Sequence, residues 1–369
     1  MTISSYKIKE IYESVINSDT LCLYDNFDYE HLEFLYHIFK INKTFKKINI
    51  ECRGCFRFST EKIELICRIL NKCSSVVHIR IIEYSNNIDP FPFSNIITSI
   101  CSNNHNLKRL DLSRSIKNIN DLSILFESIS NTTIKTIDLS YNEFDDSIFK
   151  KIVEFIKSNV RNITQIVLSC CSIENNHIME LSNSLKINTI LKNIDLSSNF
   201  FNHKCIRFIS EALITNSTLK TLRIDYNYIY GRGIYQLCNM LLINRTLEKL
   251  YMKYPSNYIK LKHVFCLINA LKINNSLRII HFFDDESFDD QCTVVDDIQT
   301  KTLTLLKEYN SSLIDVKFDD SCDHKHHDRK RKIEYISEID KFLERNKIKK
   351  KFEETNFLSL VSQQLNKLE

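Results

Sequence analysis

Short apolar clusters with one fixed internal spacing recur along most of the chain. When each cluster is numbered from its first apolar residue, hydrophobic side chains stand at positions 1, 4, 6 and 11, and Asn stands at position 9. The clearest copies begin at Ile134, Leu191 and Leu219, and the copy that begins at Ile163 has Cys171 in place of the Asn. Apolar and polar residues alternate over positions 3 to 7, which predicts a short, half-buried strand in each copy.

Weaker copies extend this pattern in both directions. They begin at residues 45, 76 and 107 before the clearest copies and at residues 247, 277 and 313 after them, and residues 21–23 mark a still earlier one. The intervals between neighbouring copies run from 27 residues (107 to 134) to 36 residues (277 to 313). A period in this range predicts a solenoid of stacked units that share one continuous core.

The segment between two strands carries an apolar pattern of helical period. Ile206, Ile209 and Leu213 are spaced i, i+3 and i+7, and the next unit repeats the spacing. Asn precedes the first apolar position by three residues in most units, at Asn42, Asn104, Asn131, Asn188, Asn216, Asn244, Asn274 and Asn310. Because the chain has only three Gly, we expect these Asn residues to adopt the left-handed conformation that ends a helix.

These units resemble leucine-rich repeats of the ribonuclease-inhibitor-like subclass, in which every repeat carries an α-helix. Repeats of this subclass also occur in the activating protein of the Ran GTPase and in NOD-like receptors. The resemblance implies an α/β fold, a right-handed horseshoe with a parallel sheet on its concave face and helices outside. We expect an N-terminal cap at residues 1–17, about eleven repeats over residues 18–323, and a basic linker with a C-terminal helical cap at residues 324–369. Pro255 and the insertion at 283–297 depart from the repeat pattern.

The strand positions that face away from the core predict a surface for a partner. Positions 3, 5, 7 and 8 are expected on the concave face, whereas positions 1, 4, 6, 9 and 11 point inward. Basic and aromatic residues gather at the outward positions of three consecutive units: Arg223, Tyr226, Lys249, Tyr251, Lys253, Tyr254, His281 and Phe283. Tyr and Arg are frequent interface hot spots, so this cluster is a candidate binding patch. The alternative is that Tyr is simply a favourable residue on a strand surface.

Composition narrows the classes of function. Gly231 and Gly233 are the only closely spaced glycines, and neither phosphate-binding glycine motif occurs. No nucleophile, base and orienting group can be assembled from spacing, so we expect a non-catalytic protein without a cofactor. The N-terminus lacks the apolar core of a secretory signal, and the longest apolar stretch, Met240–Ile243, is too short to span a bilayer. We therefore expect a cytoplasmic protein whose 13 cysteines are reduced.

Two groups of potential zinc ligands occur, and neither predicts a site. Cys52 and Cys55, with Cys67 and Cys73 downstream, superficially suggest four thiolates. Cys55 falls on an inward repeat position and Cys67 on the apolar face of a helix, where Cys acts as a small apolar residue. The second group comprises Cys322, His324, His326 and His327, whose spacing fits no familiar closed site.

The C-terminal segment is strongly basic. Residues 324–332 contain five Lys or Arg and one Asp, a net charge of +4 that equals the formal charge of the whole chain. A second basic run covers residues 347–351. These runs could act as a nuclear-import signal or contact an anionic membrane or RNA weakly, and otherwise they are solvated linkers before capping helices.

The repeats favour a non-catalytic scaffold that binds a protein partner through the concave sheet face. One alternative is a regulator of an enzyme such as a small GTPase, although the Ran activator has an acidic C-terminal tail where this chain is basic. A second alternative is a substrate-recruiting adaptor for ubiquitin ligation, although only about seventeen residues precede the repeats, which leaves no space for an F-box.

Overall fold

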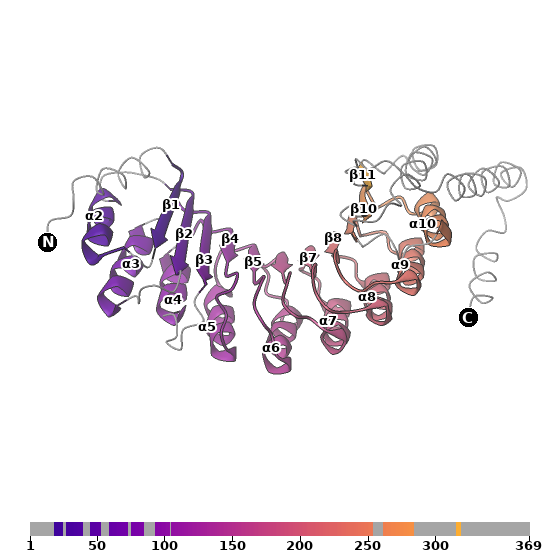
Figure 1. Cartoon of the computed structure of the whole chain (residues 1–369), viewed down its shortest axis with the longest axis horizontal. Coiled ribbons are helices and arrows are strands. Elements are labelled where there is room, and N and C mark those ends of the chain that lie inside the picture. The colour runs from indigo at the N-terminus through magenta and orange to yellow at the C-terminus, as the bar shows by residue number, and fades with distance from the viewer. Residues whose placement is uncertain are drawn as a thin grey trace, which may run out of the picture.

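The computed structural model describes residues 18–24, 27–39, 45–52, 59–72, 75–84, 93–103, 105–253, 261–283 and 315–318. Strands and helices alternate along these segments and form one curved arc, with the strands inside and the helices outside (Figure 1). The predicted caps at residues 1–17 and 324–369 lie outside the described residues.

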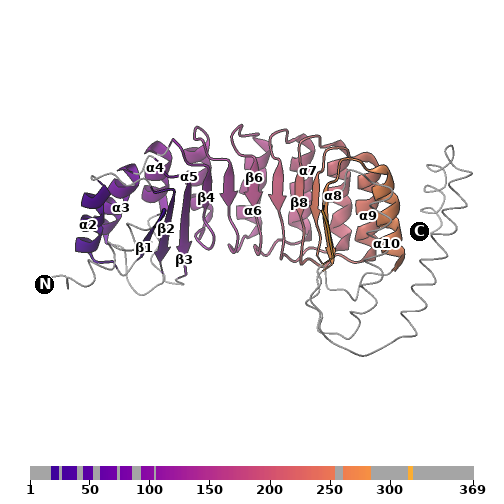
Figure 2. The same ribbon diagram turned by 90° about the horizontal axis from the view of Figure 1, so that it is seen from above.

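Every described strand belongs to one parallel sheet of eleven strands, arranged in the order of the sequence. The strands are β1 (Thr20–Tyr24), β2 (Lys47–Cys52), β3 (His78–Glu83), β4 (Arg109–Asp111), β5 (Thr136–Asp138), β6 (Gln165–Val167), β7 (Asn193–Asp195), β8 (Thr221–Arg223), β9 (Lys249–Tyr251), β10 (Ile279–Phe283) and β11 (Asp315–Phe318). Figure 2 looks onto the sheet and shows them side by side.

One helix packs behind the sheet in each described repeat from β1 to β9. The helices are α2 (Tyr29–Phe39), α3 (Thr60–Lys72), α4 (Phe93–Asn103), α5 (Ile119–Ile129), α6 (Asp146–Lys157), α7 (Asn175–Ile187), α8 (His203–Thr215), α9 (Gly231–Ile243) and α10 (Leu261–Ile273). Adjacent strands are about 4.8 Å apart, whereas helix axes need roughly 8–10 Å. This mismatch bends the stack and places the sheet on the inside of the curve.

The strand register confirms the repeat phase predicted from the sequence. Position 5 of every unit pairs with position 5 of the next: Cys22, Asn49, Arg80, Asp111, Asp138, Val167, Asp195, Arg223, Tyr251, His281 and Lys317. Position 6 forms a continuous apolar row behind the sheet, in which Leu139, Leu196 and Ile224 are each at most 1% exposed. The units therefore share a single elongated core.

The Asn at position 9, where a unit has one, holds its turn to the neighbouring units. The side-chain amide of Asn199 donates to the carbonyl oxygens of Leu168 and Leu196, both at 2.9 Å. Its Oδ1 accepts from the backbone N–H groups of Cys171 at 2.9 Å and Ile173 at 3.0 Å. Asn142 and Asn227 repeat the amide bonds to the preceding unit and to their own. In the unit that begins at Ile163, where Cys171 replaces this Asn, the Cys171 thiol donates to the Leu139 carbonyl at 3.1 Å.

The helix-ending Asn residues are not left-handed, contrary to the prediction. Asn188, Asn216 and Asn244 have φ values of −76°, −72° and −65° with extended ψ. Each instead ties its turn to the unit before it: the Asn216 amide donates to the carbonyls of Leu185 and Asn188. Asn131 and Asn274 have no positive φ either, whereas Asn159 does, at 53°. Asn42, Asn104 and Asn310 lie outside the described residues.

Candidate functional site

Cations and acids alternate between neighbouring strands on the concave face. Arg80 Nε lies 3.3 Å from an Asp111 carboxylate oxygen, and Arg109 pairs with Asp138 one strand further along. Arg223 Nε lies 3.2 Å from an Asp195 carboxylate oxygen. The face is thus crossed by short ion pairs that join consecutive repeats.

The centre of the predicted patch is an ordered row of side chains across β7 to β10. Besides Asp195, the Arg223 guanidinium contacts the Asp225 carboxylate at 3.2 Å. Its central carbon lies 4.4 Å from the centroid of the Tyr251 ring. That ring meets the His281 imidazole edge to face, at 4.7 Å and 75°. A cation held over an aromatic face is attracted by the ring quadrupole, so these contacts fix Arg223 and Tyr251 in one arrangement.

The other predicted patch residues lie near this row to different degrees. Tyr226 is 44% exposed, and Lys249 and Lys253 are half-buried. The Lys253 backbone N–H donates to Asp225 Oδ1 at 2.8 Å, although burial still raises the pKa of the Asp225 carboxyl. Tyr254 lies outside the described residues, and Phe283 is described only as the last residue of β10.

Several central residues predicted on the concave solvent surface are buried instead. Asp111 and Asp138 are each 7% exposed. Each begins an Asp-Leu-Ser sequence, and its carboxylate accepts hydrogen bonds from the Ser two residues later, through Ser113 Oγ and Ser140 Oγ at 2.6 Å. These bonds end the strand and turn the carboxylate back onto its own chain. Burial raises the pKa of Asp138.

In the units of β4 to β8, the residue at position 8 lies beyond the end of the strand in a left-handed conformation. The members with φ between 54° and 61° are Arg114, Tyr141, Cys170, Ser198 and Tyr226. Non-Gly residues adopt this conformation at a cost of roughly 1–2 kcal/mol, so it is imposed by the turn that the ladder Asn closes. The conformation repeats through five consecutive units and directs the chain outward at the carboxyl edge of the sheet.

Exposed aromatic side chains gather along this carboxyl edge, and the sequence analysis assigned only Tyr226 among them to a site. They are Tyr84, Tyr141, Phe200, Tyr226 and Tyr228, exposed by 44–55%. The rings of Phe200 and Tyr228 stack across two repeats, at 6.5 Å and 19°. Their recurrence at positions 8 to 10 was the signal in the sequence that could have identified them.

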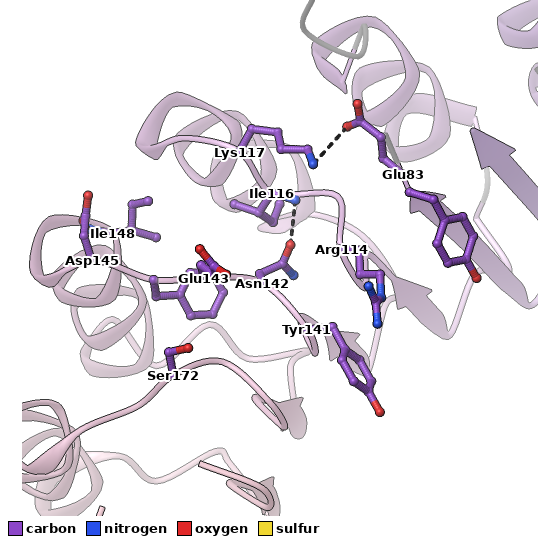
Figure 3. Close-up of a pocket in the computed structure, with 12 residues that line it drawn as sticks. Glu83, Arg114, Ile116, Lys117, Tyr141, Asn142, Glu143, Asp145, Ile148 and Ser172 are labelled. Carbon is purple, nitrogen blue, oxygen red and sulfur yellow. Dashed lines mark hydrogen bonds and ion pairs between the residues drawn. The ribbon is translucent and has the colours of Figure 1, made fainter. Parts of the chain in front are cut away.

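The same edge is hollowed between β3 and α6 (Figure 3). The hollow has a volume of about 660 Å³. Arg114 lies against its two Tyr neighbours, 4.9 Å from the Tyr141 ring and 5.8 Å from the Tyr84 ring. On the inner side, Lys117 Nζ lies 3.8 Å from the Glu83 carboxylate. A wall with aromatic rings and both signs of charge suits the side chains of a polypeptide.

Solved structures share this architecture. A leucine-rich repeat-containing protein, LegL7 from Legionella pneumophila, aligns with 87% of this chain and 96% of its own at 14% identity, with a TM-score of 0.54. The chain folds as a leucine-rich repeat solenoid. Shorter matches are the actin-binding site 2 of leiomodin-1 (24% identity, 44% of this chain and 97% of that one, TM-score 0.36) and a tropomodulin C-terminal domain from Caenorhabditis elegans (11%, 43% and 93%, TM-score 0.36). Neither a family model nor a curated protein matches the sequence.

One of the candidate zinc cysteines departs from its predicted place. Cys52, at outward position 8, is buried at the end of β2, whereas Cys67 lies on α3 as predicted, where burial raises the pKa of its thiol. Cys55, Cys73 and the Cys322–His327 group lie outside the described residues. Within the segments that the structure does describe, no three His, Cys, Asp or Glu residues lie close enough together to hold a metal ion.

No helix in the described repeats is both long and apolar enough to cross a membrane.

Proposed function

We propose that this protein is a non-catalytic scaffold that binds a protein partner on the concave face of its sheet, with the row Arg223, Tyr251 and His281 as the anchor. The observation that carries the proposal is the order of this row: Tyr251 is held between the Arg223 guanidinium at 4.4 Å and the His281 ring at 4.7 Å. Immobilising a side chain on binding costs about 0.5–1.5 kcal/mol. An anchor that is already fixed avoids much of that cost.

Exposed aromatic residues next to the row enlarge the proposed surface. Tyr226 and Tyr228 follow β8 directly, and Phe200 stacks on Tyr228. Scattered exposed aromatic residues are ordinary, but a contiguous group beside a concave sheet is typical of a protein interface. The anchor and these rings together would give a partner both an apolar and a polar contact area.

The polar groups of the concave face favour binding over catalysis. The central carboxylates accept hydrogen bonds from their own turns, as Asp138 does from Ser140, and pair with arginines of neighbouring strands. Carboxylates and arginines that are paired in this way stabilise the repeat stack, and their exposed atoms can form hydrogen bonds with a partner.

The proposal also includes the ribonuclease-inhibitor-like subclass of repeat. A complete helix of 11 to 13 residues follows each strand from β1 to β9. The cytoplasmic location, with entry to the nucleus through residues 324–332, stays a prediction from the sequence.

Affinity capture with the intact chain tests the concave surface. We expect the double variant Tyr226→Ala with Tyr251→Ala to lose partners that the wild type recovers. The substitutions remove the exposed ring of Tyr226 and the Tyr251 ring that is held between Arg223 and His281. The matched control, Met179→Ala with Ile243→Ala, removes exposed apolar surface from the helices, where these residues are 44% and 56% exposed. The proposal fails if the double Tyr variant retains every partner that the control retains.

A further inference from the structure

A row of basic residues runs along the amino edge of the sheet, opposite the aromatic edge. Position 2 of each repeat immediately precedes the strand, and its occupants are Asp19, Lys46, Val77, Lys108, Lys135, Thr164, Lys192, Lys220, Glu248 and Arg278. Backbone hydrogen bonds hold these residues in adjacent rungs: the N–H of Lys135 donates to the carbonyl of Lys108 at 2.8 Å, and that of Lys220 to Lys192 at 2.7 Å. We call the six Lys and Arg residues of this row the basic edge.

Most side chains of the basic edge are available to a ligand. Lys46, Lys108, Lys135, Lys192 and Arg278 are exposed. Lys108, Lys135 and Lys192 form no ion pair with another described residue, whereas Lys220 lies 2.9 Å from Glu248. The row therefore presents exposed cations at five of its ten positions, with Val77, Thr164 and Glu248 interrupting it.

Cations in and beside the row contribute to the pKa shifts of two titratable groups at this edge. The pKa of Glu248 is lowered, chiefly by its hydrogen bond from Lys220, and Arg278 and Lys249 add to the effect. The pKa of His78 is lowered, first by burial and then by the charges of Arg109 and Lys47. The cations beside Glu248 thus lower its pKa as neighbouring positive charge does, and at His78 neighbouring cations add to a shift that burial causes first.

The opposite edge carries charges of both signs. Acidic residues end a strand or begin helices there, among them Glu83, Asp121, Asp145 and Asp146, and Arg114 and Lys117 lie at the same edge. Acids at helix N-termini and bases near helix C-termini complement the helix dipole, which explains the acids at this edge. The basic edge lies on strand-leading residues rather than on the helices, so the dipole alone does not account for it.

We propose that the basic edge binds an extended acidic segment of a partner polypeptide. Eight rungs separate Lys46 from Arg278, a path of about 38 Å at about 4.8 Å per rung. An extended peptide covers that path with about 12 residues at about 3.3 Å each. Alternate residues of such a peptide would direct their carboxylates at the lysines, and this surface is distinct from the concave anchor of the proposed function.

The geometry favours a polypeptide over a nucleic acid. Positions 2 and 3 of the described repeats contain no Phe, Tyr or Trp, and single-stranded nucleic acids rely on such rings for stacking. The row also follows the inside of a curve (Figure 1). A duplex has a persistence length of about 50 nm and would have to bend to track it, whereas an unfolded acidic peptide conforms at little cost.

Oligoglutamate peptides of 4, 8, 12 and 16 residues, titrated against the full chain, test this proposal. We expect affinity to rise with length up to about 12 residues and then to level off, because longer peptides extend past the row. Affinity should fall as salt rises. A triple variant, Lys108→Gln with Lys135→Gln and Lys192→Gln, should bind the 12-residue peptide with about tenfold lower affinity. This is the effect expected from the loss of three exposed ion pairs.

The matched control is Lys150→Gln with Lys204→Gln and Arg232→Gln, which removes the same charge from exposed helix positions. We expect this control to change affinity less than twofold. The basic run at residues 324–332 contributes equally to all these chains, and the comparison is repeated with its five Lys and Arg changed to Gln. Equal effects of the two triple variants would overturn the proposal, as would tighter binding of an oligonucleotide of the same charge.

Discussion

At the residue scale, the same side chain type serves different purposes according to which turn of the repeat it occupies. The ladder Asn could be predicted, because its spacing from the apolar positions recurs and Asn199 makes the bonds that such spacing implies. The Asp-Leu-Ser turns could not be predicted, because the alternation of apolar and polar residues does not distinguish a buried Asp in a strand from an ordinary surface acid. Only the coordinates show that Asp111 and Asp138 accept hydrogen bonds from the Ser two residues later.

The buried Asp138 carboxyl gives a pH dependence with a definite sign. Burial raises its pKa in the folded protein above its value in the unfolded chain, so the folded state binds this proton more tightly. The carboxyl therefore destabilises the fold above its folded pKa, and this penalty disappears as pH falls through the window between the unfolded and the folded pKa. We expect the stability of the wild type relative to Asp138→Asn to rise between pH 7 and pH 4, measured by urea denaturation.

Asp145 provides the opposite case within the next turn. Its exposed carboxylate caps α6, accepting from Ser147 Oγ at 2.7 Å and from the Ile148 N–H at 2.8 Å. The Ser147 hydrogen bond, with the backbone bond behind it, lowers the pKa of this group. The stability of the wild type relative to Asp145→Asn should therefore fall as the pH drops below 3.8, the ordinary Asp pKa, and toward the lowered pKa of the folded state. Slopes of the same sign for the two variants would contradict the assigned causes.

At the element scale, the helix ends show where sequence reasoning fell short. The positions of the helix-ending Asn residues were predicted correctly, but their left-handed conformation was not. Asn216 takes an extended conformation and bonds in two directions: its amide reaches back to Leu185 at 2.7 Å, and its Oδ1 accepts from Thr218 and Leu219 at 2.9 and 2.8 Å. An isolated sequence window cannot reveal bonds to the preceding repeat.

These bonds predict a destabilisation that the left-handed interpretation would not. Asn216→Gly removes a buried side chain that makes four hydrogen bonds to the backbone, so the free energy of unfolding should fall by about 2–4 kcal/mol. The control is Asn159→Gly, because Asn159 has a φ of 53° that Gly adopts without strain. The free energy of unfolding of Asn159→Gly should differ from that of the wild type by less than about 1 kcal/mol. Chemical denaturation measures both, and a neutral Asn216→Gly would contradict the bonding.

The two close glycines have a packing role that their spacing did not reveal. A Cβ on Gly231 would lie 2.2 Å from the His263 ring of α10, and one on Gly233 would lie 2.6 Å from the Ile229 side chain. Both glycines therefore let α9 approach its surroundings closely. The sequence excluded a phosphate-binding motif here, but the reason for two glycines in a Gly-poor chain depends on packing contacts, with the next repeat at Gly231 and within the repeat at Gly233.

At the scale of the whole molecule, the number, order and register of the strands followed from periodicity alone. Apolar positions at fixed spacing leave only one phase in which every unit buries the same face, so Leu139, Leu196 and Ile224 had to align. The basic row at the amino edge was missed, because position 2 was not among the positions expected on the concave face. The basic edge lies at position 2, next to the strand rather than on it.

A stack in which each repeat contacts only its neighbours should transmit damage over a limited distance. Leu196→Ala removes a core side chain that is 0% exposed, and such changes destabilise by about 2–5 kcal/mol. We expect hydrogen-exchange protection to fall in β6, β7 and β8, where the unit of Leu196 meets its neighbours, and to change little in β2 and β3. Exposed Phe200 in the same unit supplies the control, since Phe200→Ala should leave protection unchanged throughout. An equal loss in every described strand after Leu196→Ala would instead indicate one cooperative block, and the nearest-neighbour account of this solenoid's stability would then be wrong.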